Sequence, residues 1–170
     1  MVDIDVAAPT WAEAGVDLEA QCRTAVAAAA AAATTELARD VARLDAEVSV
    51  RLTDDEEISA LNSTYRNRDT ATNVLSFPGC SADELGMLAD GAPMLLGDIV
   101  IAFGVVAREA EAQGKTLTDH LSHLLVHGML HLLGYDHIET EDAETMESLE
   151  TSVLAGLGIA NPYDERDVVS

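Results

Sequence analysis

All five histidines of this 170-residue chain lie between residues 120 and 137. Three of them, His127, His131 and His137, stand in the segment HGMLHLLGYDH. Histidines four residues apart lie one turn apart on the same face of a helix, so both imidazoles can bind a single zinc ion. The spacing H-x3-H-x5-H therefore predicts a metal site that holds one Zn²⁺ per chain.

The third ligand has to come from beyond the helix, because a histidine one further turn along would strain the angle at the metal. Gly134 can take the left-handed conformation that ends a helix, and we expect the chain to turn there and bring His137 back to the ion. Three neutral ligands leave a position for water, whose pKa zinc lowers toward about 7, as in catalytic sites. Asp136 is expected to hold one imidazole in its tautomer.

The other two histidines carry weaker signals. His123 precedes His127 by one turn and faces either the metal or the core, and the core is the favoured interpretation. His120 lies off that face and is expected to be exposed to solvent. Packing or surface roles for the whole cluster would not account for three histidines at this spacing followed by a glycine.

The residue after His127 separates this motif from that of zinc peptidases. In H-E-x-x-H that position holds the glutamate that acts as general base. Here it is Gly128, so the metal-binding pair is kept and the carboxylate is absent. A peptidase built on this helix would need another base, and peptidase activity is therefore the weaker alternative.

The elements that must position these residues follow from apolar periodicity. Strands come early in the chain and helices dominate late, which indicates a single α+β domain spanning residues 1–170, with a small mixed sheet packed with about five helices. The predicted strands are 2–6, 47–53, 73–78 and 95–103, and the predicted helices lie within 10–43 (with a break near Thr34 and Thr35), 54–66, 104–113, 116–133 and 140–157.

The charge of the chain limits how it can bind nucleic acid. The net charge is −22, with nine Lys and Arg against 31 Asp and Glu, so most of the surface repels RNA and DNA. The segment SALNSTYRNR (59–68) has no acidic residue and carries Arg66 and Arg68, which makes it the best candidate for an RNA-facing patch. The alternative for Arg66 is a surface position at a helix C-terminus, which the helix dipole favours.

Two further expectations concern the compartment. The N-terminus lacks the basic segment and apolar core of a secretion signal, and the alanine run 27–33 is too short to span a bilayer. We therefore expect a cytoplasmic protein without membrane association. Cys22 and Cys80 form no CxxC pair and are expected to be reduced, inert thiols.

Three blocks together carry a resemblance to a known family. They are HGMLHLLGYDH (127–137), YRNRDTATNVLSFP (65–78) and LLGDIVIA (95–102), in that family's order and separation. Over about residues 45–158 the chain resembles the YbeY family of bacterial endoribonucleases. The resemblance implies a metalloprotease-like (zincin-like) single-domain fold.

The resemblance also implies which residues act. His127, His131 and His137 would be the metal ligands and, with Arg66, the catalytic residues. The implied activity is zinc-dependent cleavage of single-stranded RNA, in 16S ribosomal RNA 3′-end maturation, ribosomal RNA processing and ribosome quality control. The implied partners are ribosomal RNA, the small ribosomal subunit and assembly factors. A non-catalytic assembly factor with a structural metal is a further alternative.

The chain departs from the family in the second block. The family usually has Lys-Pro where this chain has Thr70-Ala71. We expect the loss of proline to loosen the turn, and with it the pose of Arg66.

Several residues are given two interpretations. Asn73 and Ser76 either contact substrate or pair within a turn, and Asp98 either lines the cleft or begins a strand. Tyr65 and Phe77 are candidates for stacking on a base, although core packing is favoured for Phe77. The acidic run 139–150 is expected to be a solvated helix face whose apolar positions belong in the core, namely Ala143, Met146, Leu149 and Val153.

Overall fold

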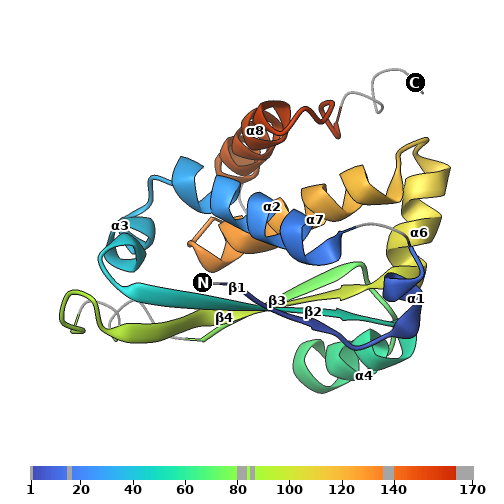
Figure 1. Cartoon of the computed structure of the whole chain (residues 1–170), viewed down its shortest axis with the longest axis horizontal. Helices are drawn as coiled ribbons and strands as arrows, with labels where there is room; N and C mark the ends of the chain where they lie inside the picture. The colour runs from blue at the N-terminus through green and yellow to red at the C-terminus, as the bar shows by residue number, and fades with distance from the viewer. Residues whose placement is uncertain (1, 15–16, 80–83, 85–86, 136–139, 164–170) are drawn as a thin grey trace.

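The computed structural model describes residues 2–14, 17–79, 84, 87–135 and 140–163, and these form a four-stranded mixed sheet with helices on both faces (Figure 1). The strand order is β1-β2-β4-β3. β1, β2 and β4 are parallel, and β3 runs antiparallel to β4 at one edge. The strands are β1 Val2–Val6, β2 Asp45–Thr53, β3 Val74–Pro78 and β4 Pro93–Ala102.

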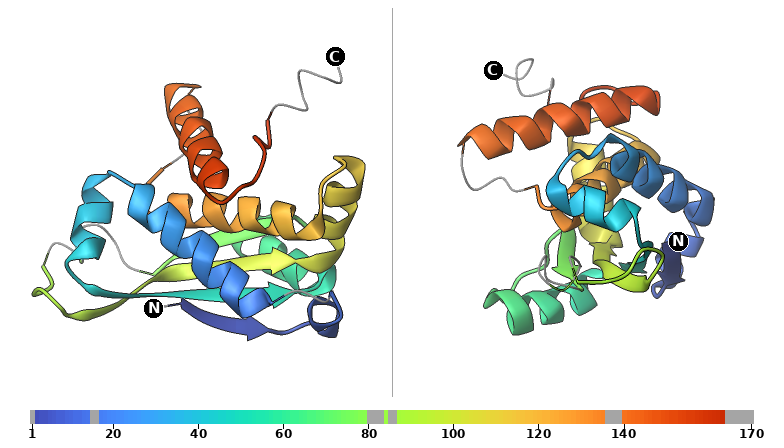
Figure 2. Two further views of the ribbon diagram at one scale, coloured as in Figure 1. Left: turned by 45° about the horizontal axis from the view of Figure 1, so that its top comes forward. Right: turned by 90° about the vertical axis from the view of Figure 1, so that its left-hand side faces the viewer.

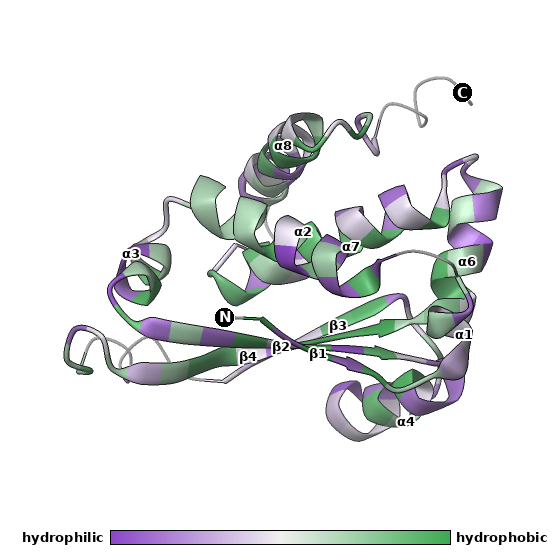
Figure 3. Ribbon diagram, viewed as in Figure 1, coloured by the Kyte–Doolittle hydropathy of each residue, from purple (hydrophilic) through white to green (hydrophobic). Residues whose placement is uncertain are grey.

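The burial of each strand follows from its sequence. The first part of β2 alternates hydrophilic and hydrophobic residues, as Figure 3 shows. Its acidic residues Asp45 and Glu47 are exposed. β4 lies between two strands, and its residues 99–102 are all buried. A continuous run of apolar residues is what a strand covered on both faces requires.

The structure has seven helices in the described ranges, against about five expected from the sequence. They are α1 Pro9–Ala12, α2 Leu18–Ala32, α3 Glu36–Ala42, α4 Asp55–Arg66, α6 Phe103–Ala112, α7 Leu117–Leu132 and α8 Thr140–Gly156. The excess arises because stretch 10–43 is divided by helix caps. Asp17 accepts a hydrogen bond from the amide of Ala20 and begins α2. Thr35 does the same with Ala38 for α3, which confirms the break predicted near Thr34 and Thr35.

The helices form layers on the sheet. α2 and α7 cover one face, α8 lies outside them, and α4 lies on the opposite face (Figures 1 and 2). The main core fills the space under α2 and α7, with Trp11, Ile99 and Leu125 fully buried. A smaller core around Ile58 and Val100 lies beneath α4. The predicted α+β class is confirmed.

Two other expectations meet the structure here. Cys22 is buried in α2, in agreement with the expectation for this thiol, and the burial raises its pKa to about 12. Cys80 lies outside the described residues. Across the described part of the chain, each helix is too short or too polar to cross a lipid bilayer.

Candidate active site

His127 and His131 lie one turn apart on α7, and both line a cleft of about 550 Å³. Their ring centroids are 4.7 Å apart, with the ring planes at 82° to each other. Arg66 lines the same cleft, although it is far from the histidines in sequence. The structure therefore brings together three of the four residues that the sequence singles out for catalysis.

Close packing holds α7 against the sheet below this cleft. The hydroxyl of Ser76 on β3 donates a hydrogen bond to the carbonyl oxygen of Gly128, at 3.3 Å. A Cβ atom at position 128 would lie 3.1 Å from Cγ2 of Ile99 and 3.2 Å from Oγ of Ser76. The position that carries the general base of zinc peptidases is thus packed against strands, and it has little room for a side chain.

This packing makes a prediction for Gly128→Glu. We expect the substitution to lower the free energy of unfolding by about 3 kcal/mol or more, because it places an uncompensated carboxylate against the buried sheet. Urea denaturation measures the change. Gly128→Ala is the matched control for steric crowding without charge and should lose much less. Wild-type stability in Gly128→Glu would show that position 128 is open enough to hold a base.

The C-terminal end of α7 is fixed as the sequence predicts. Gly134 has φ of 98°, and the amide of Tyr135 donates to the carbonyl oxygen of Leu130 at 3.0 Å, which closes the helix. The link between α2 and α3 anchors this end, since the hydroxyl of Thr35 donates to the carbonyl oxygen of Leu133 at 2.6 Å. The expected glycine stop is confirmed.

The segment that follows holds the predicted third ligand. Asp136 and His137 lie outside the described residues. Within the described ranges, no group of three or more His, Cys, Asp or Glu side chains is arranged to hold a metal ion. Metal binding by His137 and the role of Asp136 therefore stay predictions.

The described donors fit a zinc ion nonetheless. Nδ1 of His127 is hydrogen-bonded to Oε1 of Glu150, so Nδ1 is not the ring nitrogen that would bind a metal in the cleft. His131 supplies a second imidazole from the next turn. Two imidazoles, one of them hydrogen-bonded to a carboxylate, are typical of zinc sites.

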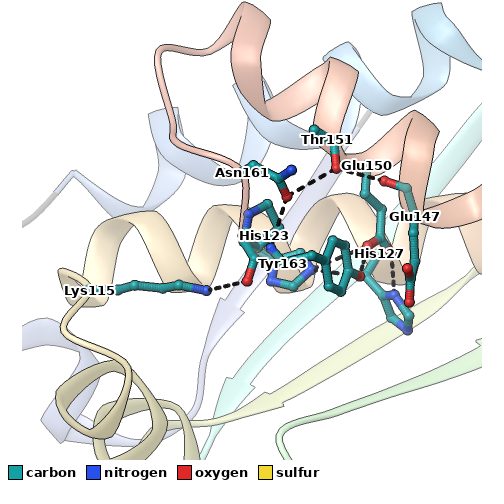
Figure 4. A network of polar contacts seen from close by, with 9 residues as sticks. Lys115, His123, His127, Glu147, Glu150, Thr151, Asn161 and Tyr163 are labelled. Atoms are coloured by element: carbon teal, nitrogen blue, oxygen red, sulfur yellow. Dashed lines mark hydrogen bonds and ion pairs between the residues drawn. The ribbon is translucent and has the colours of Figure 1, made fainter. Parts of the chain in front are cut away.

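Glu150 corrects one expectation, because it belongs to the run 139–150 that the sequence places on a solvated helix face. Its side chain is fully buried, and its carboxylate accepts hydrogen bonds from His127, from Nε2 of His123 at 3.3 Å and from the hydroxyl of Tyr163 (Figure 4). Burial alone would raise the pKa of Glu150, but these donors outweigh it and lower the pKa to about 2.

A signal for Glu150 was present in the sequence. It lies four residues after Met146 and three before Val153, and both are buried as predicted. These positions share one face of a helix, so Glu150 falls on the buried stripe and not on the exposed one. The acidic composition of the run concealed this spacing.

The two remaining histidines differ from their expected positions to different degrees. His123 is half-buried, does not line the cleft, and contacts Glu150 and Tyr163, so it agrees only in part with the favoured core position. His120 is buried, not exposed, and its Nε2 pairs with Oε1 of Glu109 at 2.9 Å. Burial lowers the pKa of His120.

Arg66 is the last residue of α4, where Asn67 adopts the left-handed conformation that ends the helix. Its Nη2 donates to the carbonyl oxygen of Ser76 at 3.0 Å, and its guanidinium carbon lies 5.3 Å from the centre of the Phe77 ring. These contacts direct the side chain across β3 to the cleft. Arg66 is thus both a helix C-terminal residue and a residue of the cleft.

The turn after Arg66 has an anchor that the missing proline does not supply. Asn62 is buried, and its side-chain amide donates to the carbonyl oxygen of Thr70 at 2.9 Å. The carbonyl oxygen of Asn62 accepts from the amide of Arg68 at 3.2 Å. Asn62 therefore ties the turn to α4 twice, through its side-chain amide and through its backbone carbonyl, so the loosening expected from Thr70-Ala71 is offset.

Asn73 and Ser76 line the cleft and also make structural contacts. The side-chain amide of Asn73 donates to Glu109 at 3.0 Å. Asp98 lies elsewhere, in a hollow of about 580 Å³ between α4 and the sheet that we call the α4 hollow. The α4 hollow is lined by Arg51, Glu57, Leu61, Tyr65, Phe77, Asp98 and Val100.

Comparison with solved structures shows that the fold is known from another protein. A protein of Thermotoga maritima, whose structure was determined in solution, shares this α+β fold with a TM-score of 0.56. The two chains are 21% identical in sequence, and the match covers 99% of this chain and 93% of that one.

The sequence comparisons then give the family. The model of the family Endoribonuclease YbeY matches residues 12–158. A protein named Endoribonuclease YbeY from Sphingopyxis alaskensis is 50% identical over 168 residues, covering 98% of each chain. Another of that name, from Paramagnetospirillum magneticum, is 47% identical over 97% of this chain and 96% of its own. The chain belongs to the Endoribonuclease YbeY family.

Proposed function

We propose that this protein is a zinc-dependent endoribonuclease that cleaves single-stranded RNA. The observation that carries the proposal is the convergence of His127, His131 and Arg66 on one cleft. The name of the family supports RNA as the substrate. We infer further that the substrate is ribosomal RNA, in the maturation of the 16S 3′ end and in ribosome quality control in the cytoplasm, and that the small subunit and assembly factors are partners.

The histidines would hold the metal. His127 and His131, together with His137, would bind one zinc ion through neutral imidazoles. A bound Zn²⁺ supplies Lewis-acid chemistry, which polarises a phosphodiester toward attack. The hydrogen bond to Glu150 already orients the ring of His127, so the ring would need little reorganisation when the metal binds.

Arg66 would bind the scissile phosphate. The transition state of phosphodiester cleavage gathers negative charge on the non-bridging oxygens, and a planar guanidinium donates two parallel hydrogen bonds to such oxygens. Its contacts with Ser76 and Phe77 restrict the side chain before substrate arrives. In a chain with net charge −22, this arginine at the cleft is a local attraction for RNA.

Substrate choice tests the proposal. Purified protein is incubated with a single-stranded RNA, with the same sequence as a duplex and with an unstructured peptide. We expect cleavage of the single strand only. Cleavage of the peptide with the RNA left intact would favour the peptidase alternative, against which the packing of Gly128 already speaks.

Tyr65 is the candidate for binding an RNA base. Its side chain is exposed, at 62%, and its ring lies 5.3 Å from that of Phe77, which also contacts Arg66. Phe77 itself packs on the smaller core, as expected. A base leaving the cleft past Arg66 would therefore meet an exposed aromatic ring.

We expect Tyr65→Ala to raise the Kd for single-stranded RNA by roughly 5- to 100-fold, because base stacking contributes about 1–3 kcal/mol. Tyr65→Phe is the matched control, since it keeps the ring and should bind like the wild type. Fluorescence anisotropy with a short labelled RNA measures both. Equal affinity of Tyr65→Ala and wild type would remove Tyr65 from the RNA-binding surface.

A further inference from the structure

We propose that Glu150 is a positioning residue for His127, which it holds as the tautomer with the proton on Nδ1, so that Nε2 is presented to the metal. The inference rests on the zinc site of the proposed function. It adds a carboxylate on α8 to a site whose other described members lie on α4, on α7, and on β3 or just before it.

Two histidine ring nitrogens and one tyrosine hydroxyl converge on the two carboxylate oxygens of Glu150. A carboxylate has no proton to give, so its partners must donate. Oε1 accepts from Nδ1 of His127, and Oε2 accepts from Nε2 of His123 and from the hydroxyl of Tyr163. His127 in its neutral form then carries its single ring proton on Nδ1, and the lone pair is on Nε2.

The surroundings hold this carboxylate in place from three directions. α8 buries Met146 and Val153 on either side of it along the same face. α7 supplies the two histidines. The third direction is residues 160–163, where the amide of Tyr163 donates to Oδ1 of Asn161 at 2.8 Å and turns the tyrosine toward Glu150 (Figure 4).

Further contacts tie residues 160–163 to both helices. The hydroxyl of Thr151 on α8 lies 3.3 Å from Oδ1 of Asn161, and Nζ of Lys115, just before α7, donates to the carbonyl oxygen of Pro162 at 3.3 Å. The ring of Tyr163 packs edge-on against His123, with centroids 5.6 Å apart. Glu150 thus has little freedom to move away from His127.

A fixed tautomer matters for metal affinity. Only the unprotonated ring nitrogen of a neutral imidazole binds a metal, and the partner on the other nitrogen decides which one that is. Loss of such an outer partner typically weakens metal binding by about 10- to 100-fold. Glu150 would therefore act before any RNA is bound.

The first test needs no variant. Nitrogen-15 NMR of the metal-free wild-type protein at neutral pH reports which ring nitrogen of His127 carries the proton. We expect a protonated Nδ1 and an unprotonated Nε2. A proton on Nε2, or a mixture of the two tautomers, would overturn the inference.

The second test measures zinc affinity by competition with a chromogenic chelator. Glu150→Met keeps the volume and removes both acceptor oxygens, and we expect zinc to bind about 10- to 100-fold more weakly. Glu150→Gln keeps one acceptor oxygen and should recover part of the loss. Glu144→Gln, exposed on the same helix, is the control and should bind zinc like the wild type.

The outcomes separate this inference from the proposed function, because neither test uses RNA. A folded Glu150→Met protein with wild-type zinc affinity would overturn the role of Glu150 whether or not the protein cleaves RNA. If that variant does not fold, the tautomer of His127 in the wild type decides. A protein that meets both expectations and leaves RNA intact would refute the nuclease proposal alone.

Discussion

His131→Ala is expected to lose zinc and RNA cleavage together, with the residual rate at least about 100-fold below wild type. The substitution removes one of the two imidazoles that the structure places on the cleft, one turn from His127. At most two ligands would then remain, and we expect zinc to dissociate from such a site when the protein is diluted. Metal content by atomic emission and cleavage of a labelled single-stranded RNA give the two readings on one sample.

His120→Gln is the control for this experiment. His120 lies on the same helix, but it is buried against Glu109, away from the cleft. We expect this variant to keep its zinc and its activity, even where its stability falls. Wild-type zinc content in purified His131→Ala would contradict the assignment of His131 as a ligand.

Arg66→Glu should separate zinc binding from RNA cleavage: we expect the variant to keep its zinc while the cleavage rate falls by about 100- to 1,000-fold. The substitution replaces a phosphate-binding cation with an anion at the edge of the cleft. It does not touch the histidines, and Arg66 is exposed, so the fold should stay intact. Single-turnover cleavage and metal content are compared with those of the wild type.

Two variants sharpen this prediction. Arg66→Lys keeps the charge but loses the planar guanidinium, and its rate should fall between those of wild type and Arg66→Glu. Arg68→Glu makes the same charge change two residues along, at an exposed position after the helix. We expect a much smaller loss there. An Arg66→Glu protein that cleaves RNA at the normal rate would show that the phosphate is held by other groups.

Local pattern was enough to predict the elements that carry the site. The alternation of VDIDV predicts the strand that the structure shows at Val2–Val6, and the spacing of His127 and His131 predicts their shared helix face. Gly134 was correctly predicted to end that helix, because few residues other than glycine adopt its φ of 98°. These features depend on neighbours within one or two turns.

Features that depend on tertiary packing were missed or misplaced. Nothing near His120 in sequence shows that Glu109 of the preceding helix will cover it. Glu150 can be buried because three side chains, two from α7 and one from Tyr163, hydrogen-bond to its carboxylate. The sequence of α8 alone does not show these partners. Arg66, by contrast, was assigned to the site correctly, but through the family resemblance, because its contact with Ser76 of β3 cannot be predicted from the residues around position 66.

Removal and return of the metal tests the central claim most directly. The wild-type protein is stripped with a chelator, its fold is checked by circular dichroism, and cleavage of a single-stranded ribosomal precursor RNA is measured before and after addition of one equivalent of Zn²⁺. We predict a folded but inactive metal-free protein whose cleavage returns with zinc. Metal-free protein that cleaves the RNA at the wild-type rate would contradict the account.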